Sequence, residues 1–432
     1  IFGLFFFGFG VPWTFNSIHE FGHAPLILSA ILASLLIIIL ALFPACVAGL
    51  TVYFHLNKQY CFSAAVTFAC LWVIFEWIRG WIFTGFPWLL IGHVHHSGPL
   101  QGLLPVFGSF GASWVTILLG CFIAVLVFAE VKQKILAVIT LMIIAISLYF
   151  ANQIIWTNAE DEKLDVVLIQ GNISQEMKWD RTKHVYIMEK YLAMSKGHFD
   201  ADIIVWPETA IPTYYSMVKD SFIRKVKQTA DENNIDYLMG VFTFDPNNAH
   251  VYNSVMTLGS ELGFYRKQHL VPFGEYIPFR GLLTFLERYI DLPMADISKG
   301  EGKPLVSLKG HSVGTSICYE AVYGNEVINA MPEAKFLINV SNDAWFGDSL
   351  APHQHLEITR SRAVETGRYL LRSTNTGISA VIDPYGKIIN KSAQFQDDVV
   401  RATISPYTGI TLYARWGNWG IMSIIFGCLL LL

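Results

Sequence analysis

The sequence predicts a polytopic α-helical membrane domain joined to a water-soluble α/β domain. Two observations lead to this fold class. Hydrophobic residues make up 53% of the chain and charged residues only 15%, which is far from the composition of soluble domains. The charged residues are also placed unevenly, since all but 8 of the 64 lie in residues 160–408. The rest of the chain therefore suits lipid, and residues 160–408 suit water.

The apolar parts divide into segments long enough to cross a bilayer, which takes about 20 residues per helix. We expect membrane spans near residues 1–14, 26–54, 61–79, 105–129, 135–156 and 412–432. Both chain ends lie inside apolar runs, so we expect further sequence beyond each of them. The resulting domains are membrane helices at 1–157, an α/β domain at 158–408 and a last membrane helix at 409–432.

Short basic loops predict how the spans are oriented, because Lys and Arg prefer the cytoplasmic side of a membrane. Lys58 lies in one such loop, and Lys132 and Lys134 lie in another. The order of the spans places both loops on the same side. The helix that ends near Trp156 then exits on the opposite side, which predicts an extracytoplasmic position for residues 158–408.

Residues 158–408 alternate short apolar runs with amphipathic stretches, a pattern typical of a layered α/β domain. We expect strands at 165–169, 202–206, 237–243, 313–317, 336–340 and 377–382. Because apolar residues recur at three- and four-residue steps, we expect helices at 183–197, 216–233 and 353–368. In such folds the active site lies just after the carboxyl ends of the strands.

Residues capable of chemistry occupy these positions. Glu208 follows Ile-Ile-Val-Trp-Pro, Cys318 follows Val-Gly-Thr-Ser-Ile, and Asn342-Asp343 follow Leu-Ile-Asn-Val-Ser. Lys267 lies in the run Gly-Phe-Tyr-Arg-Lys-Gln-His-Leu, close to a Pro-Phe-Gly-Glu turn. The sequence therefore predicts a site that contains a carboxylate, an ammonium and a thiol.

Cys318 is the only one of six cysteines in the water-soluble stretch. A thiol is intrinsically nucleophilic and mainly needs a neighbouring base, so Cys318 is a candidate nucleophile. The other cysteines lie in or beside predicted spans and are assigned to packing: Cys46, Cys61, Cys70, Cys121 and Cys428. With one soluble thiol, a disulfide framework is excluded for the α/β domain.

Three short motifs carry a family resemblance. Trp206-Pro-Glu208, Tyr265-Arg-Lys267 and Ile317-Cys318-Tyr-Glu320 occur in this order, with 59 residues from Glu208 to Lys267 and 51 from Lys267 to Cys318. They resemble the Glu-Lys-Cys triad of the nitrilase, or carbon-nitrogen hydrolase, superfamily. Longer motifs narrow the resemblance to apolipoprotein N-acyltransferases: Gln170-Gly-Asn-Ile with Lys178-Trp179-Asp180, the run 269–278, and Asn339-Val-Ser-Asn-Asp-Ala-Trp-Phe-Gly347.

This resemblance covers essentially the whole chain, and it implies a fold, a location and a reaction. The implied fold of residues 158–408 is the nitrilase-like α-β-β-α sandwich, on the periplasmic side of a bacterial inner membrane. The implied donor is a phospholipid, typically phosphatidylethanolamine, which gives an acyl chain to the cysteine. The thioester then acylates the α-amine of a diacylglyceryl-cysteine at the amino terminus of an apolipoprotein.

The residue types suit this chemistry. Glu208 is the expected base, which takes the Cys318 proton and passes it to the departing lysophospholipid. Lys267 is expected to face the tetrahedral oxyanion together with backbone N–H groups beside Cys318. The scheme requires no cofactor. The net charge of −4 and the lack of a basic cluster also give no indication of nucleic-acid binding.

Five further residues are assigned to the pocket from the resemblance. Glu275 is expected to support the triad, and Trp179, Asn253, Tyr319 and Glu320 to surround the substrate. Most of them also have a purely structural interpretation. Trp179 fits a core aromatic residue, Asn253 a turn residue and Glu320 a structural ion pair.

Two histidine patterns suggest metal sites, and we assign neither. His19-Glu20-Phe-Gly-His23 matches the zinc-protease pattern, but Gly22 and Pro25 disfavour the helix that would align the two histidines. A third ligand is also not evident. His93, His95 and His96, like His353 and His355, lack acidic or thiol residues at ligand spacing.

The main alternative is a membrane-tethered nitrilase-type amidase or hydrolase, in which water rather than an amine resolves the thioester. A catalytically inactive lipid-binding domain is a third possibility, disfavoured by the complete set of triad residues. A site that opens toward lipid favours acyl transfer. The amphipathic run 279–290 is a candidate lid over the acyl chain, although a surface helix packed on the core explains it equally well.

Overall fold

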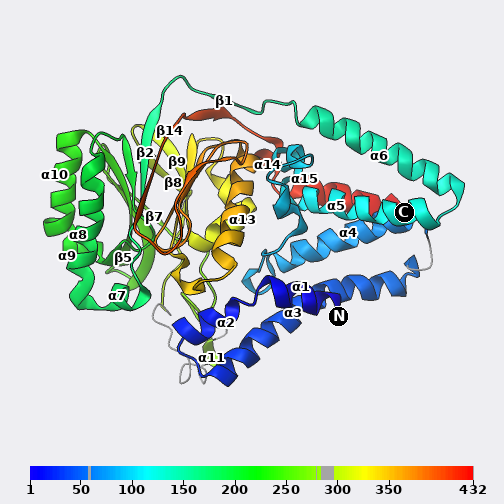
Figure 1. The fold of residues 1–432 in the computed structure, drawn as a ribbon, viewed down its shortest axis with the longest axis horizontal. Coiled ribbons are helices and arrows are strands. Elements are labelled where there is room, and N and C mark those ends of the chain that lie inside the picture. Colours follow the sequence, from blue (N-terminus) through cyan, green and yellow to red (C-terminus); the bar gives the residue numbers. More distant parts are fainter. Residues whose placement is uncertain (57–59, 279, 284–295, 432) are drawn as a thin grey trace.

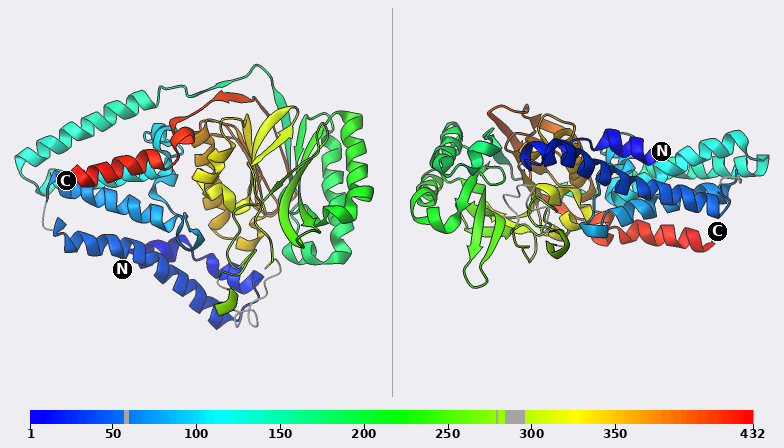
Figure 2. Two further views of the ribbon diagram at one scale, coloured as in Figure 1. Left: turned by 180° about the vertical axis from the view of Figure 1, so that it is seen from behind. Right: turned by 90° about the horizontal axis from the view of Figure 1, so that it is seen from below.

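The computed structural model describes residues 1–56, 60–278, 280–283 and 296–431. Figures 1 and 2 show a group of long helices on one side of the molecule and two packed sheets on the other. This arrangement confirms the predicted fold class, a helical membrane part combined with an α/β domain. Most of the proposed lid, residues 284–290, lies outside the described residues, which include only the short helix α11 (Arg280–Leu283) of that run.

In the described part of the chain, four helices are long and apolar enough to cross a membrane. They are α3 (Leu26–Tyr53), α4 (Phe62–Arg79), α5 (Leu104–Phe128) and α6 (Val131–Ala151). Shorter helices occupy the two ends of the chain: α1 (Phe2–Gly10), α2 (Thr14–Asn16), α14 (Leu412–Trp416) and α15 (Trp419–Leu431).

The last predicted span is wrong as a single helix. The chain breaks between α14 and α15 at Gly417, whose φ of 57° is the left-handed conformation that glycine adopts at least cost. Helix α6 also ends five residues before the expected Trp156. The chain leaves α6 as an extended segment that runs toward the sheets (Figure 1).

The residues at the start of α4 contact the connection between α5 and α6. The Tyr60 ring contacts the Phe128 ring with centroids 5.1 Å apart. The Phe62 N–H donates to Gln133 Oε1 at 3.0 Å, next to Lys132 and Lys134 on the first turn of α6. Figure 1 places these helix ends away from the sheets.

The strands of the described residues form two larger sheets and one small pair. One sheet has the order β14-β2-β3-β5-β6-β7 with β4 beside β5, and the other has the order β13-β12-β11-β10-β9-β8. The small pair joins β1 (Thr157–Ala159) to β15 (Tyr407–Gly409). The bounds in the first sheet are β2 (Leu164–Gln170), β3 (Ile203–Val205), β4 (Ile211–Tyr214), β5 (Asp236–Asp245), β6 (His250–Leu258), β7 (Gly263–Arg266) and β14 (Asp398–Ile404). Those in the second are β8 (Leu305–Leu308), β9 (His311–Ile317), β10 (Phe336–Ser341), β11 (Leu370–Thr374), β12 (Ala380–Ile382) and β13 (Ile388–Lys391).

Helices cover the outer faces of both sheets (Figure 1). The first sheet is covered by α8 (His184–Ser195) and α10 (Arg224–Asn233), and the second by α13 (Ala351–Thr366). Short helices fill the connections: α7 (Gln175–Trp179), α9 (Tyr215–Val218) and α12 (Gly324–Val327). The layers therefore follow the order α-β-β-α.

Apolar side chains from both sheets meet in one core between them. Leu168 and Val205 come from the first sheet, Ile317 and Val340 come from the second, and all four are buried. Strands β2, β3 and β5 run parallel, as do β9, β10 and β11. Burial on both faces explains why β2, β3, β5, β9 and β10 are largely apolar runs and were visible in the sequence. The sequence did not predict β11, where the run is interrupted by Arg372.

Candidate active site

Glu208 lies in a tight turn just beyond β3. Thr209 has a φ of 49°, and the turn packs against Gly240 of β5. A Cβ at Gly240 would lie 2.4 Å from Thr209 N and 2.5 Å from Pro207 O, closer than any real contact. The turn can approach β5 only because residue 240 is glycine. This approach places the Glu208 carboxylate inside the domain, where it is 5% exposed.

Glu208 belongs to a buried ionic cluster. Asn253 of β6 donates from Nδ2 to Glu208 Oε1 at 2.7 Å and to Glu275 Oε1 at 2.9 Å. Lys267 Nζ lies 2.9 Å from Glu275 Oε2 and 3.7 Å from Glu208 Oε1. The Val271 N–H also donates to Glu275 Oε2 at 2.8 Å. Asn253 thus joins the two carboxylates, and Lys267 lies between them.

These contacts fix the charge on Lys267. Burial alone would lower the pKa of Lys267, but the carboxylates of Glu275 and Glu208 outweigh it and raise the pKa above its usual value. Lys267 therefore stays protonated. A permanent, buried ammonium is suited to stabilising negative charge that develops beside it.

Cys318 follows β9 directly and has a φ of 51°, which is strained for a residue with a side chain. Its carbonyl is held by two buried side chains. The His355 ring, through Nε2, lies 3.2 Å from Cys318 O, and Asn339 Nδ2 donates to the same oxygen at 3.4 Å. The backbone of the cysteine is therefore held in place while its thiol stays free of these bonds.

The thiol of Cys318 is neutral in this structure. Burial, helped by the Glu208 carboxylate, raises the pKa of Cys318 to about 12, although Lys267 pulls it the other way. A thiolate is needed for attack on a carbonyl. The proton must therefore leave during the reaction, and Glu208 is the carboxylate that most strongly affects this thiol.

Asp343, His355 and Arg372 form a second buried network behind Cys318. Arg372 Nη2 donates to Asp343 Oδ2 at 2.8 Å, and His355 Nδ1 lies 3.1 Å from Asp343 Oδ1. Burial alone would raise the pKa of Asp343, but Arg372 and His355 hold it well below its usual range. The sequence drew attention to Asp343 by its place after a strand, but it gave no sign that Asp343 acts through His355.

Glu320 is buried and accepts hydrogen bonds from N–H and O–H groups. Tyr265 OH donates to Glu320 Oε1 at 2.8 Å, and the backbone N–H groups of Gln268 and His269 donate to the same oxygen. The Ile317 N–H donates to Glu320 Oε2 at 2.7 Å. Glu320 thus joins the segment after Lys267 to the segment before Cys318.

Tyr319 faces the membrane part rather than the ionic cluster. Its hydroxyl donates to Gly85 O at 3.0 Å, and its ring belongs to an apolar cluster with Val11, Trp13 and Trp88. Trp179 is half-buried at the end of α7, with its ring 6.2 Å from that of Phe242. Of the proposed site residues, the structure brings Glu208, Lys267, Glu275 and Asn253 into one bonded cluster.

Lys178 is a residue that sequence reasoning passed over. It is fully buried, and its ammonium donates to Thr209 Oγ1 at 2.9 Å and to Glu208 O at 3.3 Å. The sign available in the sequence was the position of Lys178 beside Trp179, in a motif from which only the tryptophan was assigned to the pocket. A lysine in a short helix is ordinarily a surface residue, so the sequence gave no reason to bury it.

No group of three or more potential metal ligands occurs in the described part of the chain. His19 and Glu20 lie in a π-helical turn (Ser17–Phe21), while His23 lies beyond it with a φ of 49°. The two histidines of this pattern are therefore not on one regular helix. His355 is committed to Asp343 and Cys318, as described above.

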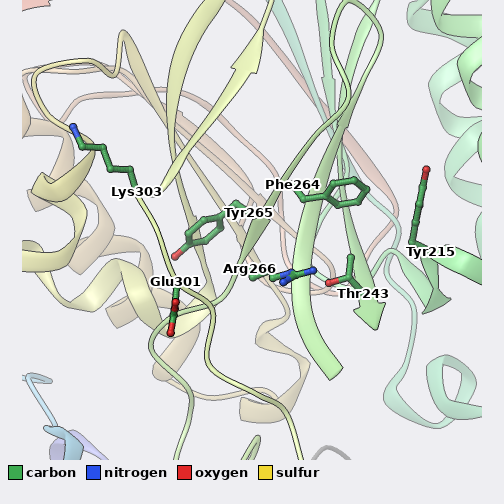
Figure 3. A pocket seen from close by; sticks show the side chains of 7 residues that line it. All are labelled: Tyr215, Thr243, Phe264, Tyr265, Arg266, Glu301 and Lys303. Carbon is green, nitrogen blue, oxygen red and sulfur yellow. The ribbon is translucent and has the colours of Figure 1, made fainter. Parts of the chain in front are cut away.

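An open pocket of about 380 Å³ lies around the edge strand β7 (Figure 3). Phe264, Tyr265 and Arg266 line it from β7, and the other lining residues are Tyr215, Thr243, Glu301 and Lys303. None of the proposed site residues lines this pocket, although Tyr265 also contacts Glu320. The pocket is therefore separate from the buried cluster.

Comparison with known proteins covers both parts of the chain. The carbon-nitrogen hydrolase family model matches residues 166–411, and the apolipoprotein N-acyltransferase N-terminal domain model matches residues 1–122. The apolipoprotein N-acyltransferase of Methylococcus capsulatus is 37% identical over 429 residues, which cover 99% of this chain and 85% of that protein. The chain belongs to the apolipoprotein N-acyltransferase family.

Other apolipoprotein N-acyltransferases match equally well. The one from Coxiella burnetii is 37% identical, over 100% of this chain and 89% of its own length. The one from Pseudomonas aeruginosa is 37% identical, over 98% of this chain and 84% of its own length. Among solved structures, Saccharomyces cerevisiae Nit3, of the nitrilase superfamily, aligns with a TM-score of 0.44 and 20% identity, over 58% of this chain and 93% of that one. Family membership makes this protein an acyltransferase with several membrane helices, as the sequence predicts.

Proposed function

We propose that the protein moves an acyl chain from a phospholipid to the α-amine of a diacylglyceryl-cysteine on an apolipoprotein, through a thioester on Cys318. One observation carries this proposal. A strained, buried thiol lies in the electrostatic field of a carboxylate and an ammonium, Glu208 and Lys267, that are themselves fixed by hydrogen bonds. The proposed catalytic residues are Glu208, Lys267 and Cys318.

In the first half-reaction, Glu208 takes the proton of Cys318 as the sulfur attacks the ester carbonyl of the phospholipid. Negative charge moves to the carbonyl oxygen, where Lys267 and backbone N–H groups beside Cys318 stabilise it. The carbon–oxygen bond to the glycerol breaks, and Glu208 returns its proton to the departing lysophospholipid. The products are a lysophospholipid and the Cys318 thioester.

In the second half-reaction, the α-amine of the apolipoprotein attacks the thioester carbonyl. Glu208 accepts a proton from the attacking nitrogen and then protonates the departing sulfur. An amide forms and the thiol is regenerated. Glu275 contacts Lys267, and Asn253 contacts Glu208. These contacts keep the ammonium and the base in place through both steps.

Contacts with the membrane part support a lipid donor. Tyr319, next to Cys318, donates to Gly85 O, and Tyr323 donates to the same oxygen at 3.0 Å. Gln354 of α13 accepts hydrogen bonds from Trp13 and Trp88. Trp13 precedes α3 in the chain, and Trp88 follows α4. The segment that carries the nucleophile is therefore built against the membrane domain, which is where a phospholipid ester is available.

Phosphatidylethanolamine is the proposed donor, and the proposed location is the bacterial inner membrane with the α/β domain on the periplasmic side. The start of α6, which carries Lys132 and Lys134, lies away from the sheets (Figure 1) and supports this orientation. In this arrangement the thiol lies on the side of the membrane that the basic loops avoid.

Intact mass measurement tests the proposal. After incubation with phosphatidylethanolamine in detergent micelles, the protein should gain the mass of one acyl chain, located on Cys318 by peptide mapping. Addition of a diacylated lipopeptide with a free α-amine should discharge the adduct and yield the triacylated peptide. Cys318→Ser should form no adduct, and full N-acylation by this variant would refute the assignment.

The same measurement separates acyl transfer from hydrolysis. A thioester that decays in buffer at the rate seen with the lipopeptide would identify a hydrolase. A lipopeptide blocked at its α-amine is the matched control, because it retains the lipid but cannot attack. Stability with the blocked peptide and discharge by the free amine support the transferase.

A further inference from the structure

Lys178 is a buried charge to which the reaction scheme gives no role. It belongs to α7, on the segment between β2 and α8, and its side chain contacts the turn formed by Glu208 and Thr209. It is among the largest fully buried side chains of the described protein. Burying an ammonium is costly unless its surroundings compensate the charge.

The surroundings of Lys178 are unusual for such a residue. Among the described residues, no carboxylate oxygen lies within 4.0 Å of its Nζ, and its partners are a hydroxyl and a carbonyl, Thr209 Oγ1 and Glu208 O. Burial lowers the pKa of Lys178 to about 8, while Glu208 and Cys318 act to raise it. The charge of Lys178 is therefore directed at the two residues that exchange a proton in the proposed reaction.

The charges of the site balance only when Lys178 is counted. Glu208 and Glu275 contribute two negative charges, and Lys267 contributes one positive charge. With Lys178 protonated, the four groups sum to zero while Cys318 is neutral. Without it, the cluster carries excess negative charge, which opposes the ionised form of Glu208 and the transfer of negative charge toward sulfur.

Lys178 also contacts the strained part of the turn. Thr209 has a φ of 49°, and its hydroxyl accepts the shorter of the two hydrogen bonds from Lys178. The Glu208 carbonyl accepts the other. These two bonds hold the carbonyl of the Glu208–Thr209 peptide and the Thr209 side chain, while the Asn253 bond holds the Glu208 carboxylate.

We propose that Lys178 is a positioning residue for the base: its ammonium fixes the Glu208–Thr209 turn and supplies the positive charge that keeps Glu208 ionised. This inference rests on the proposed function, since it assigns Lys178 to the base of that reaction. It makes Lys178 part of the acyl-transfer centre without contact with the substrate.

The first test measures formation of the Cys318 adduct in Lys178→Met, which keeps the length of the side chain and removes its charge. We expect the maximal acylation rate to fall about 10- to 100-fold, with the KM for phosphatidylethanolamine in micelles within about twofold of wild type. Lys190→Met is the matched control, because Lys190 forms a surface ion pair with Asp397. An unchanged rate in Lys178→Met would overturn the proposal.

The pH profile separates this role from a purely structural one. Charged or titratable groups near Glu208 are Lys267, Glu275, Lys178 and Cys318. Loss of the Lys178 charge disfavours the carboxylate form of Glu208, so the acid limb of the acylation rate should move to higher pH. A limb at the wild-type position, whatever the rate, would show that Lys178 does not act through the ionisation of Glu208.

A second pair of variants keeps the test valid if Lys178→Met does not fold. Thr209→Val removes the hydroxyl that accepts from Lys178 but preserves the shape of the side chain, and Thr209→Ser preserves the hydroxyl. We expect acylation to fall about tenfold in Thr209→Val and to be largely restored in Thr209→Ser, since only serine can accept the bond. Equal rates in the two variants would contradict the positioning role.

Wild-type protein distinguishes failure of this inference from failure of the proposed function. If wild type forms no acyl adduct on Cys318, the function itself is wrong. If wild type forms the adduct and the Lys178 and Thr209 variants match it, only the role of Lys178 is wrong.

Discussion

The two sheets of the sandwich contribute different chemistry to one site. The first sheet holds the charged groups, Glu208 after β3 and Lys267 after β7, together with the Asn253 amide of β6 in one bonded cluster. The second sheet holds a neutral thiol on a strained backbone, Cys318 after β9. The buried ions of this sheet, Asp343 and Arg372, contact His355. His355 in turn contacts the backbone carbonyl of Cys318 and not its sulfur.

This difference bears on how the thiol would lose its proton in the proposed reaction. The charges of the ionic cluster compensate one another, so the cluster does not favour ionisation of the buried thiol. The pKa of Cys318 is accordingly raised. Proton transfer then depends on the alignment of the two sheets, which the core between them sets. Cys318 itself packs in that core beside Tyr265 and Ile317. The apolar core thus serves catalysis as well as stability.

The largest loss of activity is expected when the proposed base is removed from the first sheet. Glu208→Gln keeps the shape and the Asn253 contact but cannot accept a proton, so acylation of Cys318 should fall by about 10² to 10⁴. The measurement is the rate of adduct formation by intact mass. Glu189→Gln, at an exposed ion pair with Lys225, is the matched control. A thioester that accumulates normally would assign the base to another residue.

The thiol of the second sheet can be tested without a variant. With a pKa of about 12, about 10⁻⁴ of Cys318 is thiolate at pH 8, against roughly 10⁻¹ for an ordinary thiol of pKa about 9. Alkylation of Cys318 by iodoacetamide should therefore be on the order of 10³ slower than in the unfolded protein and should rise about tenfold per pH unit between pH 7 and 9. Peptide mapping measures this. Fast alkylation with no dependence on pH would indicate a preformed thiolate.

Removing Lys267 sharpens the comparison, because it takes away the cation that contacts the carboxylates of the first sheet directly. Lys267→Met should lower the turnover number by about 10² to 10³ through loss of oxyanion stabilisation, with a smaller effect on KM. It should also cost about 3 to 5 kcal/mol of stability, since Glu275 and Glu208 remain buried. Single-turnover kinetics and thermal unfolding measure the two effects. An unchanged turnover number would remove Lys267 from the oxyanion role.

The sequence predicts the strands of the two sheets unequally well, and the difference follows strand type. Buried parallel strands such as β2 and β10 are continuous apolar runs, and they were found with nearly correct bounds. The antiparallel hairpin of β6 and β7 was missed because its residues alternate with polar positions such as Asn253 and Arg266. Lys267 was therefore placed by its motif and not by a strand.

The site residues divide in a similar way. Glu208, Lys267 and Cys318 could be proposed from the sequence because each stands in a short motif at a defined distance from the next. Lys178 and the bond from His355 to Cys318 were not found, because they depend on which side chains meet in space. The nearest of these contacts joins residues 30 apart in the chain, and no local pattern reports it.

The smallest effect is expected behind the thiol, where the second sheet holds backbone instead of charge. His355→Leu removes the bond to Cys318 O and leaves only the 3.4 Å bond from Asn339. A looser Cys318 backbone should lower acylation about tenfold, and the loss of one hydrogen bond at the carbonyl and one at Asp343 should cost about 1 to 3 kcal/mol of stability. His353→Leu, on the exposed side of the same helix, is the matched control. If His355→Leu instead lost as much activity as Glu208→Gln, the histidine would be acting on the proton of the thiol, and the division between a charged sheet and a nucleophile sheet would fail.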